Sequence, residues 1–394
     1  MTAAIELLGE EFPAREISGT LSGAGLAWDS TAIIRLTGLT TVPAGVQLTI
    51  GPGTRVELEA DVRLDVNGAV ICGGTAEAPV VFAPRRPDQP WGEVNHDQGR
   101  GDYTYTFFTG GGGDPGRSFG HSGSQPVLRG VSSFLRLDHV YFLDNPGKAL
   151  GTVRSTLLME DCLVSRCDTG GELVSTEAVI DRCAWIDIPS GDTVEVDDDN
   201  DALYLSGYEE GANATLIANS VFVSGKDDGI DHNGAEVVVD NCVIEDFDNE
   251  GVAASNRNRI EITNTLILGC EQGIEAGYGS PEVVVNHCVI VGCDTGLRFG
   301  DWYDLGCTGT LEVLNTISDG NHIRNAWNYD LSLDGPREGA VTITYSIVNV
   351  AEYDGGEGCL TGDVSFDGEY LLLPDSPGIG AASDGLDMGL LPPP

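Results

Sequence analysis

Short runs of alternating hydrophobic and polar residues fill much of the chain, and most runs end at glycine, proline or asparagine. Early examples are Ile33–Leu36, Val46–Ile50 and Val62–Val66. A period of two is typical of β-strands, and the interruptions mark tight turns. This early region carries no amphipathic helical pattern. The alternation therefore predicts an all-β chain built from many short strands.

A four-residue pattern recurs in the second half of the chain: a polar residue, a small one, an aliphatic one and then an outward-facing one. Its copies begin at Asp201, Asp228, Glu250, Gln272 and Thr295, which are 27, 22, 22 and 23 residues apart. A repeat in the twenties is the signature of a solenoid, in which each coil buries its apolar side only by stacking on its neighbours.

A second repeated position precedes each copy and is often occupied by asparagine, as at Asn219, Asn241 and Asn264. Asparagine at a turn bonds to nearby backbone groups, and stacked asparagines can also bond to one another from coil to coil. We expect a ladder of interior amides at this turn. Replacing one amide with leucine is then expected to leave buried partners unsatisfied.

Three short strands per coil with one asparagine turn describe a parallel β-helix. Over roughly residues 32–350 the chain resembles the pectate-lyase-like superfamily, and a right-handed helix is what this resemblance implies. We therefore expect an N-terminal cap at 1–30, the β-helix at 31–350, and a C-terminal cap and tail at 351–394.

The segment 92–126 breaks the rhythm with clustered aromatic residues, among them Tyr103 and Phe108, followed by four consecutive glycines. A long loop inside a compact repeat is either functional or inert. The sequence leaves both alternatives open: a folded flap over one face of the solenoid, or an insertion without a role.

The charge balance restricts the partners. The 394 residues carry 20 Lys and Arg against 62 Asp and Glu, a formal net charge of -42. Such a surface repels nucleic acid and anionic membranes, and it repels a polyanionic sugar unless cations intervene. No apolar run is long enough for a membrane helix. The ten cysteines are expected to be mainly buried thiols stacked inside the coils.

Alternation also fixes which side chains face outward. The inward positions are Leu203, Ile230, Val252, Ile274 and Leu297. The outward positions are Glu172, Tyr204, Asp231, Ala253, Glu275 and Arg298, beside a second polar column of Asp201, Asp228 and Glu250. Carboxylates this close cannot all stay ionised without a cation. Ca²⁺ prefers six to eight oxygen ligands, so we expect it at Asp201, Asp227, Asp228 and Asp231.

The run Asp227-Asp-Gly-Ile-Asp231 resembles the Asp-Asp-Gly-Phe-Asp calcium motif of family 9 pectate lyases, in which a further Asp comes from the preceding coil, where Asp201 stands here. That family uses a lysine base on a later coil, and no lysine follows Lys226 in this chain. The resemblance implies an extracellular or cell-surface polysaccharide lyase, although the start of the chain shows no signal-peptide pattern.

Without that lysine, Arg257, Arg259 or Arg298 would have to serve as the base, and the candidate catalytic residues for such a lyase are Arg257 and Arg298. Tyr278, Trp302 and Tyr303 are candidates for stacking on sugar rings.

Two alternatives remain open. In a glycoside hydrolase, paired carboxylates such as Asp228 with Glu250, or Asp231 with Glu275, would flank the scissile bond. Polygalacturonases resemble the chain in fold and in an Asp followed by an Asp-Asp pair, but their Gly-His-Gly and Arg-Ile-Lys motifs are absent. The repeats also resemble non-catalytic β-helix domains of bacterial surface proteins, where Ca²⁺ would only stiffen the coils.

Overall fold

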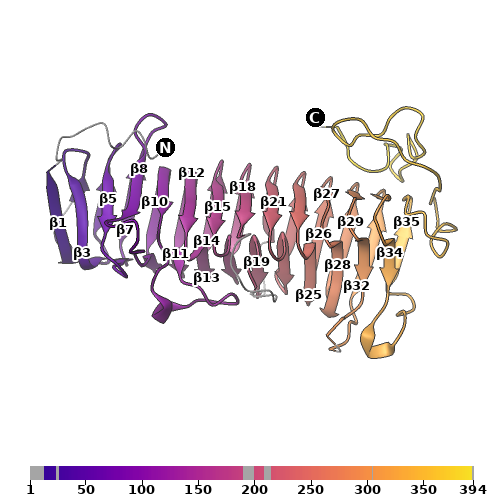
Figure 1. Cartoon of the computed structure of the whole chain (residues 1–394), viewed down its shortest axis with the longest axis horizontal. Coiled ribbons are helices and arrows are strands. Elements are labelled where there is room, and N and C mark those ends of the chain that lie inside the picture. Colours follow the sequence, from indigo (N-terminus) through magenta and orange to yellow (C-terminus); the bar gives the residue numbers. More distant parts are fainter. Residues whose placement is uncertain (1–12, 24–25, 190–198, 208–213, 304, 393–394) are drawn as a thin grey trace.

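The computed structural model describes residues 13–23, 26–189, 199–207, 214–303 and 305–392. In these residues the chain forms 35 strands joined by parallel pairing, two short 3-10 helices, η2 (Pro115–Arg117) and η3 (Leu331–Leu333), and no α-helix. The strands stack into one elongated solenoid (Figure 1). The all-β, parallel β-helix prediction is thereby confirmed.

The pairing divides the strands into three columns, named here sheets 1, 2 and 3 in the order in which each coil crosses them. Sheet 1 contains β2 (Leu26–Trp28), β4 (Gln47–Ile50), β7 (Ala69–Gly73), β14 (Thr156–Glu160), β17 (Glu177–Asp181), β20 (Thr215–Ala218), β23 (Val237–Asp240), β26 (Arg259–Thr263), β29 (Glu282–Asn286), β32 (Thr310–Leu314) and β35 (Val341–Thr344).

Sheet 2 contains β5 (Arg55–Leu58), β8 (Val80–Pro84), β15 (Leu163–Cys167), β18 (Ala184–Ile188), β21 (Val221–Gly225), β24 (Val243–Phe247), β27 (Leu266–Leu268), β30 (Val289–Val291) and β33 (Ile317–Ser318). Sheet 3 contains β6 (Leu64–Val66), β9 (Val94–Asp97), β11 (Pro126–Val131), β13 (Lys148–Val153), β16 (Glu172–Val174), β19 (Leu203–Ser206), β22 (Ile230–Asn233), β25 (Glu250–Asn256), β28 (Gln272–Gly279), β31 (Thr295–Phe299) and β34 (Arg324–Asn328).

Four longer strands bend across a corner and belong to two sheets. They are β1 (Ala14–Thr20) and β3 (Ile33–Val42), which join sheets 2 and 3, and β10 (Arg100–Thr109) and β12 (Phe134–Asn145), which join sheets 1 and 2. Because β1 and β2 already pair with the strands of the next coil, regular coils begin before residue 31, inside the segment expected to be a cap.

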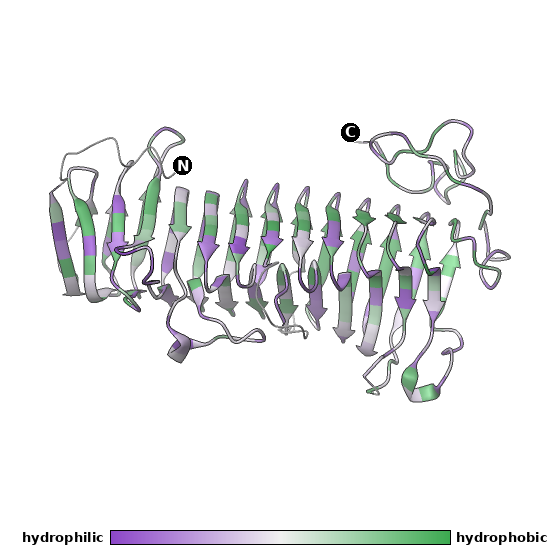
Figure 2. Ribbon diagram, viewed as in Figure 1, coloured by the Kyte–Doolittle hydropathy of each residue, from purple (hydrophilic) through white to green (hydrophobic). Residues whose placement is uncertain are grey.

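The core is a stack of equivalent apolar side chains. Ile230 pairs with Val252, Val252 with Ile274, and Ile274 with Leu297, and all four are at most 1 % exposed. Aromatic side chains stack in the same way on sheet 2, where the rings of Trp185 and Phe222 lie 4.8 Å apart. Figure 2 shows this repetition as hydrophobic bands at equivalent places on successive strands. The solenoid is therefore held by contacts between neighbouring coils.

The asparagine ladder lies at the corner between sheets 1 and 2. Asn241 donates through Nδ2 to Oδ1 of Asn219 at 2.7 Å, and Asn264 donates in turn to Asn241 at 3.1 Å. These residues have positive φ angles of 45–54°, a region that asparagine tolerates better than most residues. The expected ladder is present, but Asn219 and Asn241 are exposed, so the expectation of interior amides is wrong.

The cysteines follow the expected pattern. All ten are free thiols, and nine of them are buried. Burial raises the pKa of the Cys167 thiol to about 12, so this thiol stays protonated and behaves as a small apolar side chain.

The segment 92–126 is only partly an insertion, which corrects the expectation of a loop over its whole length. β9 and most of β10 are regular strands of the solenoid, and Tyr103 and Phe108 are fully buried in its core. The residues that leave the coil are 110–125, which include η2 and lie just before β11. We call them the inserted loop.

Two groups of loops project from the same edge of the solenoid, the lower edge in Figure 1. One is the inserted loop, and the other consists of the connections β31–β32 and β34–β35. The C-terminal segment lies on the opposite side, where Met388 and Ala382 pack against Val289 and Ile317. Its Leu391 backbone N–H donates to Asn264 Oδ1 at 2.7 Å, so this segment covers the end of the asparagine ladder.

Candidate functional site

One outward column of sheet 3 carries three of the candidate site residues, namely Asp231, Glu275 and Arg298. In register from coil to coil it contains Glu172, Tyr204, Asp231, Ala253, Glu275, Arg298 and Trp327. This is the outward order that the alternation predicts, continued by one residue. His232, the neighbour of Asp231, points inward and is fully buried.

Three of the four predicted calcium ligands meet. Asp201, Asp228 and Asp231 each offer a carboxylate oxygen within 4.8 Å of the others; we call them the carboxylate cluster. Asp227 is 6 % exposed and accepts a hydrogen bond from Asn249 at 3.2 Å, but it is not part of this group. The first two cluster members are buried, at 2 % and 6 % exposure, so their charge is poorly screened by water.

Burial and crowding perturb the acids at this point. Desolvation, followed by the negative charges of Asp201, Asp227 and Asp231, raises the pKa of Asp228 well above its usual range. Desolvation likewise raises the pKa of Glu250, with Asp228 and Glu275 adding to the effect. Neighbouring carboxylates with raised pKa values are expected either to keep protons or to bind a cation.

Glu250 occupies the junction of the acidic side chains. Its backbone N–H donates to Asp228 at 2.9 Å, and its carboxyl group accepts a hydrogen bond from Gln272 Nε2. Asp228 on the preceding coil, the predicted partner of Glu250, and Glu275 on the following coil thus both act on its carboxyl group.

Arg298 is tied into the same column. Its Nη1 lies 2.8 Å from Glu275 Oε1 and 3.2 Å from Gln272 Oε1, and the residue is only 4 % exposed. Its Nε and Nη2 atoms are buried and have no hydrogen-bond partner among the described residues. Three coil steps separate it from Asp231, a distance of about 14 Å at 4.8 Å per step. The two residues therefore cannot act on one atom of a sugar.

Arg257, the other predicted catalytic arginine, lies at the far end of β25. It is exposed and lines neither of the pockets described below. The structure thus does not bring Arg257 to the carboxylate cluster. Neither predicted arginine lies beside Asp228 and Asp231, so these two arginines do not supply a base there.

Two adjoining pockets run along this column. The first, of about 230 Å³, contains Asp228 and Asp231, and the second, of about 390 Å³, contains Arg298. Glu250, Glu275, Asn249 and Tyr303 line both. Together they form one groove, which lies between the two groups of projecting loops.

The predicted stacking residues lie along this groove. Tyr278 lines the first pocket and accepts a hydrogen bond from Asn233 at 3.2 Å, while Trp302 lines the second. Trp302 and Tyr303 are 53 % and 65 % exposed. Trp327, which sequence reasoning missed, packs 5.9 Å from Trp302; its place in the outward column could have identified it.

The inserted loop supplies a histidine that sequence reasoning also missed. His121 lines the first pocket, its Nε2 lies 2.9 Å from Asp199 Oδ1, and its ring packs 4.6 Å from Tyr204. Nothing in the local sequence indicates this position, because the loop has no repeat pattern.

A buried ion pair anchors the loop. Lys148 Nζ lies 2.9 Å from Glu172 Oε2, and the two side chains are 0 % and 1 % exposed. Lys148 also donates to the carbonyl of Phe119 at 2.7 Å, and Glu172 accepts the backbone N–H groups of His121 and Ser122. Desolvation lowers the pKa of Lys148, and the charge of Glu172 opposes that change. The carboxylate of Glu172 therefore holds the inserted loop in place and is not accessible to a ligand.

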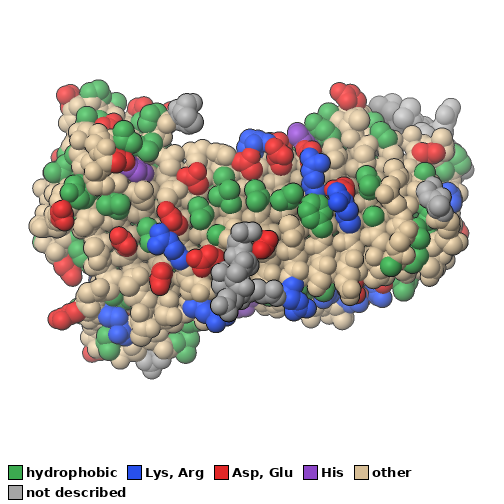
Figure 3. Space-filling model, turned by 180° about the vertical axis from the view of Figure 1, so that it is seen from behind, with side chains coloured by type: hydrophobic (Ala, Val, Ile, Leu, Met, Phe, Trp, Pro, Cys, Tyr) green, Lys and Arg blue, Asp and Glu red, His purple; other side chains and the backbone are tan. Residues whose placement is uncertain are grey.

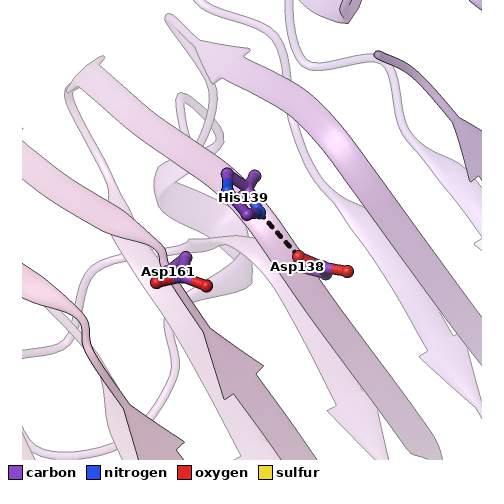
Figure 4. A group of neighbouring side chains, drawn as sticks. All are labelled: Asp138, His139 and Asp161. Carbon is purple, nitrogen blue, oxygen red and sulfur yellow. Dashed lines mark hydrogen bonds and ion pairs between the residues drawn. The ribbon is translucent and has the colours of Figure 1, made fainter. Parts of the chain in front are cut away.

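A second group with metal-ligand chemistry lies elsewhere, at the ladder corner. Asp138, His139 and Asp161 have ligand atoms within 4.8 Å of one another (Figure 4). Their partners are already local, since His139 bonds to Asp138 at 2.6 Å and Asp161 pairs with Arg182 at 2.9 Å. They lie outside the groove, so this group is a useful comparison for the carboxylate cluster.

The surface beyond the groove is mixed. On the face seen in Figure 3, a row of hydrophobic side chains runs along the middle with charged ones on either side. Val179 and Leu216, which pair across β17 and β20, are 43 % and 37 % exposed. Within the part of the chain that is described, no helix is long and apolar enough to cross a membrane.

Comparison with known proteins identifies the fold. A family model described as a right-handed beta helix region matches residues 189–325, and no curated protein matches the sequence. A solved structure of a mutant of the PL6 family alginate lyase AlyGC has a TM-score of 0.51 and 11% identity, covering 99% of this chain and 55% of that one. The chain thus spans about half the length of that protein.

Two further solved structures are more distant. A rhamnogalacturonan lyase has a TM-score of 0.46 and 13% identity, covering 80% of this chain and 82% of that one. The catalytic domain of a mutant GH87 alpha-1,3-glucanase in complex with nigerose has a TM-score of 0.44 and 10% identity, covering 79% of this chain and 63% of that one. The fold rests on the family model and on the alginate lyase structure, which both indicate a right-handed parallel β-helix, as the resemblance implied.

Proposed function

We propose that the groove on sheet 3 binds a polysaccharide at a Ca²⁺-loaded carboxylate cluster and cleaves it by elimination beside a uronate residue. The observation that supports this most directly is one pocket that is lined by two members of the cluster and by an imidazole. Asp228, Asp231 and His121 line it together. Calcium favours carboxylate oxygens, and histidine is the commonest general base.

The residues have distinct roles in this proposal. Asp201, Asp228 and Asp231 hold the cation, which when bound neutralises a sugar carboxylate and makes the neighbouring C–H more acidic. The contact with Asp199 holds the proton of His121 on Nε2, which leaves Nδ1 to accept the sugar proton. Glu250, at the junction of the two pockets, donates a proton to the departing glycosidic oxygen as the carbon–carbon double bond forms.

Elimination needs a cation because of charge. The protein carries a formal net charge of -42, and a uronate chain would be repelled from the acidic groove without one. The extracellular location expected for the chain agrees with this role, since Ca²⁺ and polysaccharides meet outside cells.

The calcium site can be tested by thermal unfolding in Ca²⁺ and in EDTA. A ligand that binds only the folded state stabilises it by about 2.7 kcal/mol at a hundredfold excess over Kd. We expect wild type to gain stability from Ca²⁺, and the double variant Asp228→Asn with Asp231→Asn to gain none. The matched control is Asp138→Asn with Asp161→Asn, which removes as many carboxylates from the other acidic group and should respond as wild type does.

The reaction can be tested with uronate-containing polysaccharides, read both for unsaturated ends and for reducing ends. We expect unsaturated product that disappears with chelator and with His121→Gln. His322→Gln, an exposed histidine outside both pockets, is the control and should retain activity.

Hydrolysis is the second candidate, because carboxylates on neighbouring coils surround Glu250, which is the arrangement that a glycoside hydrolase needs. Reducing ends without unsaturated product would favour it. Calcium stabilisation without any cleavage would instead leave a non-catalytic carbohydrate-binding or surface module.

A further inference from the structure

The second pocket has chemistry that the calcium site does not share. Among the described residues, it is lined by two guanidinium groups, those of Arg298 and Arg324, and by the indole rings of Trp302 and Trp327. It lies at the C-terminal end of the groove, beside the β31–β32 and β34–β35 connections, which project from the lower edge in Figure 1. About 14 Å separates Arg298 from Asp231 along the column, so one sugar ring cannot reach both.

Arg298 is held with an unused edge. Its Nη1 side is committed to Glu275 and Gln272. Its Nε and Nη2 are buried and lack hydrogen-bond partners in the described chain. Buried donors without acceptors are rare in folded proteins. The guanidinium edge that they form has two parallel donors, which match a ligand with two neighbouring oxygens, and such a ligand reaches them by displacing the side chains that cover this edge. Vicinal sugar hydroxyls and a carboxylate both have that geometry.

Aromatic rings surround this edge. The guanidinium carbon of Arg298 lies 5.4 Å from the ring centre of Trp302 and 6.0 Å from that of Trp327. Trp327 is also stacked against Tyr329 at 5.2 Å and covered by Arg324 at 4.0 Å. Trp302 is 53 % exposed, so it offers an open indole face next to the unused donors, which suits the apolar face of a sugar ring.

Charge decides between a neutral and an acidic sugar. The carboxylates of Glu271, Glu275 and Asp294 line the pocket, together with Glu250, which is protonated in the proposed reaction, against two guanidinium groups. Glu275 already neutralises Arg298. A uronate carboxylate at Arg298 would be repelled by these acidic side chains. Sugar hydroxyls, in contrast, can donate hydrogen bonds to the carboxylates and accept them from Arg298.

We propose that this pocket is a separate subsite for an uncharged sugar, whose ring stacks on Trp302 and whose neighbouring hydroxyls accept from Nε and Nη2 of Arg298. The inference rests on the proposed function, because it treats the groove as a polysaccharide site. It also extends that function: the substrate is a mixed polymer, with a uronate at the carboxylate cluster and a neutral residue further along.

Isothermal titration calorimetry in EDTA isolates this subsite from the calcium site, and it does not depend on the tryptophan that the test variant removes. The probes are neutral hexasaccharides of glucose, mannose, galactose, xylose and rhamnose, with hexagalacturonate and a sulfated galactan hexasaccharide as the charged counterparts. We expect at least one neutral probe to bind in EDTA. Trp302→Ala should weaken that binding by about tenfold or more, and Arg298→Lys, which keeps the charge but loses the edge, should weaken it as well.

Leu305→Ala is the matched control, since Leu305 is 68 % exposed in the same connection and lines neither pocket. Its binding should equal that of wild type. Because Trp302 is exposed, Trp302→Ala should fold even if Arg298→Lys does not. The proposal is overturned if no neutral probe binds, if a charged probe binds more tightly than every neutral one, or if Trp302→Ala binds as wild type does.

The double variant Asp228→Asn with Asp231→Asn separates this result from the proposed function. It should lose cleavage and calcium stabilisation, yet bind the neutral probe as wild type does. Loss of neutral-sugar binding in that variant would show that there is one site, and would also overturn the proposal of a separate subsite.

Discussion

Replacing Lys148 with methionine should destabilise the protein and release the inserted loop. In the folded protein Lys148 and Glu172 are 0 % and 1 % exposed and lie 2.9 Å apart. Methionine fills most of the space left by the lysine stem, so the change removes mainly the charge and its donors. Glu172 would then be a buried carboxylate without a cation.

The magnitude follows from this geometry. Removing one partner of a buried pair costs about 3–5 kcal/mol, because the other charge remains buried without compensation. The carbonyl of Phe119 also loses the Lys148 donor, which lies 2.7 Å away in the folded protein. We therefore expect a cost at the upper end of that range. Desolvation lowers the pKa of Lys148. Part of the attraction between Lys148 and Glu172 therefore only offsets the cost of burying the two charges and adds no net stability.

Chemical unfolding measures the cost, and limited proteolysis between residues 110 and 125 measures release of the loop. Arg166→Met is the control, since the Arg166–Asp144 pair is 53 % and 61 % exposed and pairs of that kind contribute at most about 1 kcal/mol. Adding Glu172→Leu to Lys148→Met should recover stability but not loop protection, because the backbone N–H groups of the loop still lack their acceptor. Equal unfolding of Lys148→Met and Arg166→Met would refute the reasoning.

Three further outcomes are expected. Ile274→Ala should cost about 2–5 kcal/mol in chemical unfolding, because Ile274 is fully buried between two neighbouring coils; a cost below that of an exposed valine truncation would contradict the stacked core. Asn241→Leu should lower the free energy of unfolding by about 1–2 kcal/mol, because Asn241 has a φ of 54° that leucine disfavours. Asn241→Gly should cost less, since glycine tolerates this φ. The reverse order of stability in thermal melts would instead support a ladder of buried amides. In EDTA the melting temperature should fall as pH rises from about 4, because Asp228 and Glu250 have raised pKa values in the folded state and keep protons that the unfolded chain releases; a melting temperature that rises over this range would contradict those shifts.

The strands and their faces follow from the sequence because each strand's alternation has one solution. A one-residue slip would turn Ile230 outward and Asp231 inward, so the core stack and the outward column were both fixed by the repeat. Alternation also places Glu172 in that column, but a strand pattern does not report that the inserted loop covers this side chain.

What the sequence does not determine is whatever depends on loops or on chain bends. Phe108 looks like part of an insertion because β10 is ten residues long and turns a corner without a glycine or proline break. His121 reaches the groove only because its loop docks on Glu172. The ladder was predicted from its residues, yet its exposure depends on how sharply the corner turns, which local pattern does not report.

The regular pairing of the coils also means that equivalent positions along the groove are separated by whole coil steps. Val252 and Ile274 hold equivalent places in adjacent coils, so deleting residues 252–273 would join Gly251 to Ile274 and leave the remaining strands in register. The distance between the carboxylate cluster and the tryptophan-lined pocket would shorten by one step of about 4.8 Å. Duplicating or deleting one coil therefore changes the spacing between the two ends of the groove by one step, while both ends keep their residues.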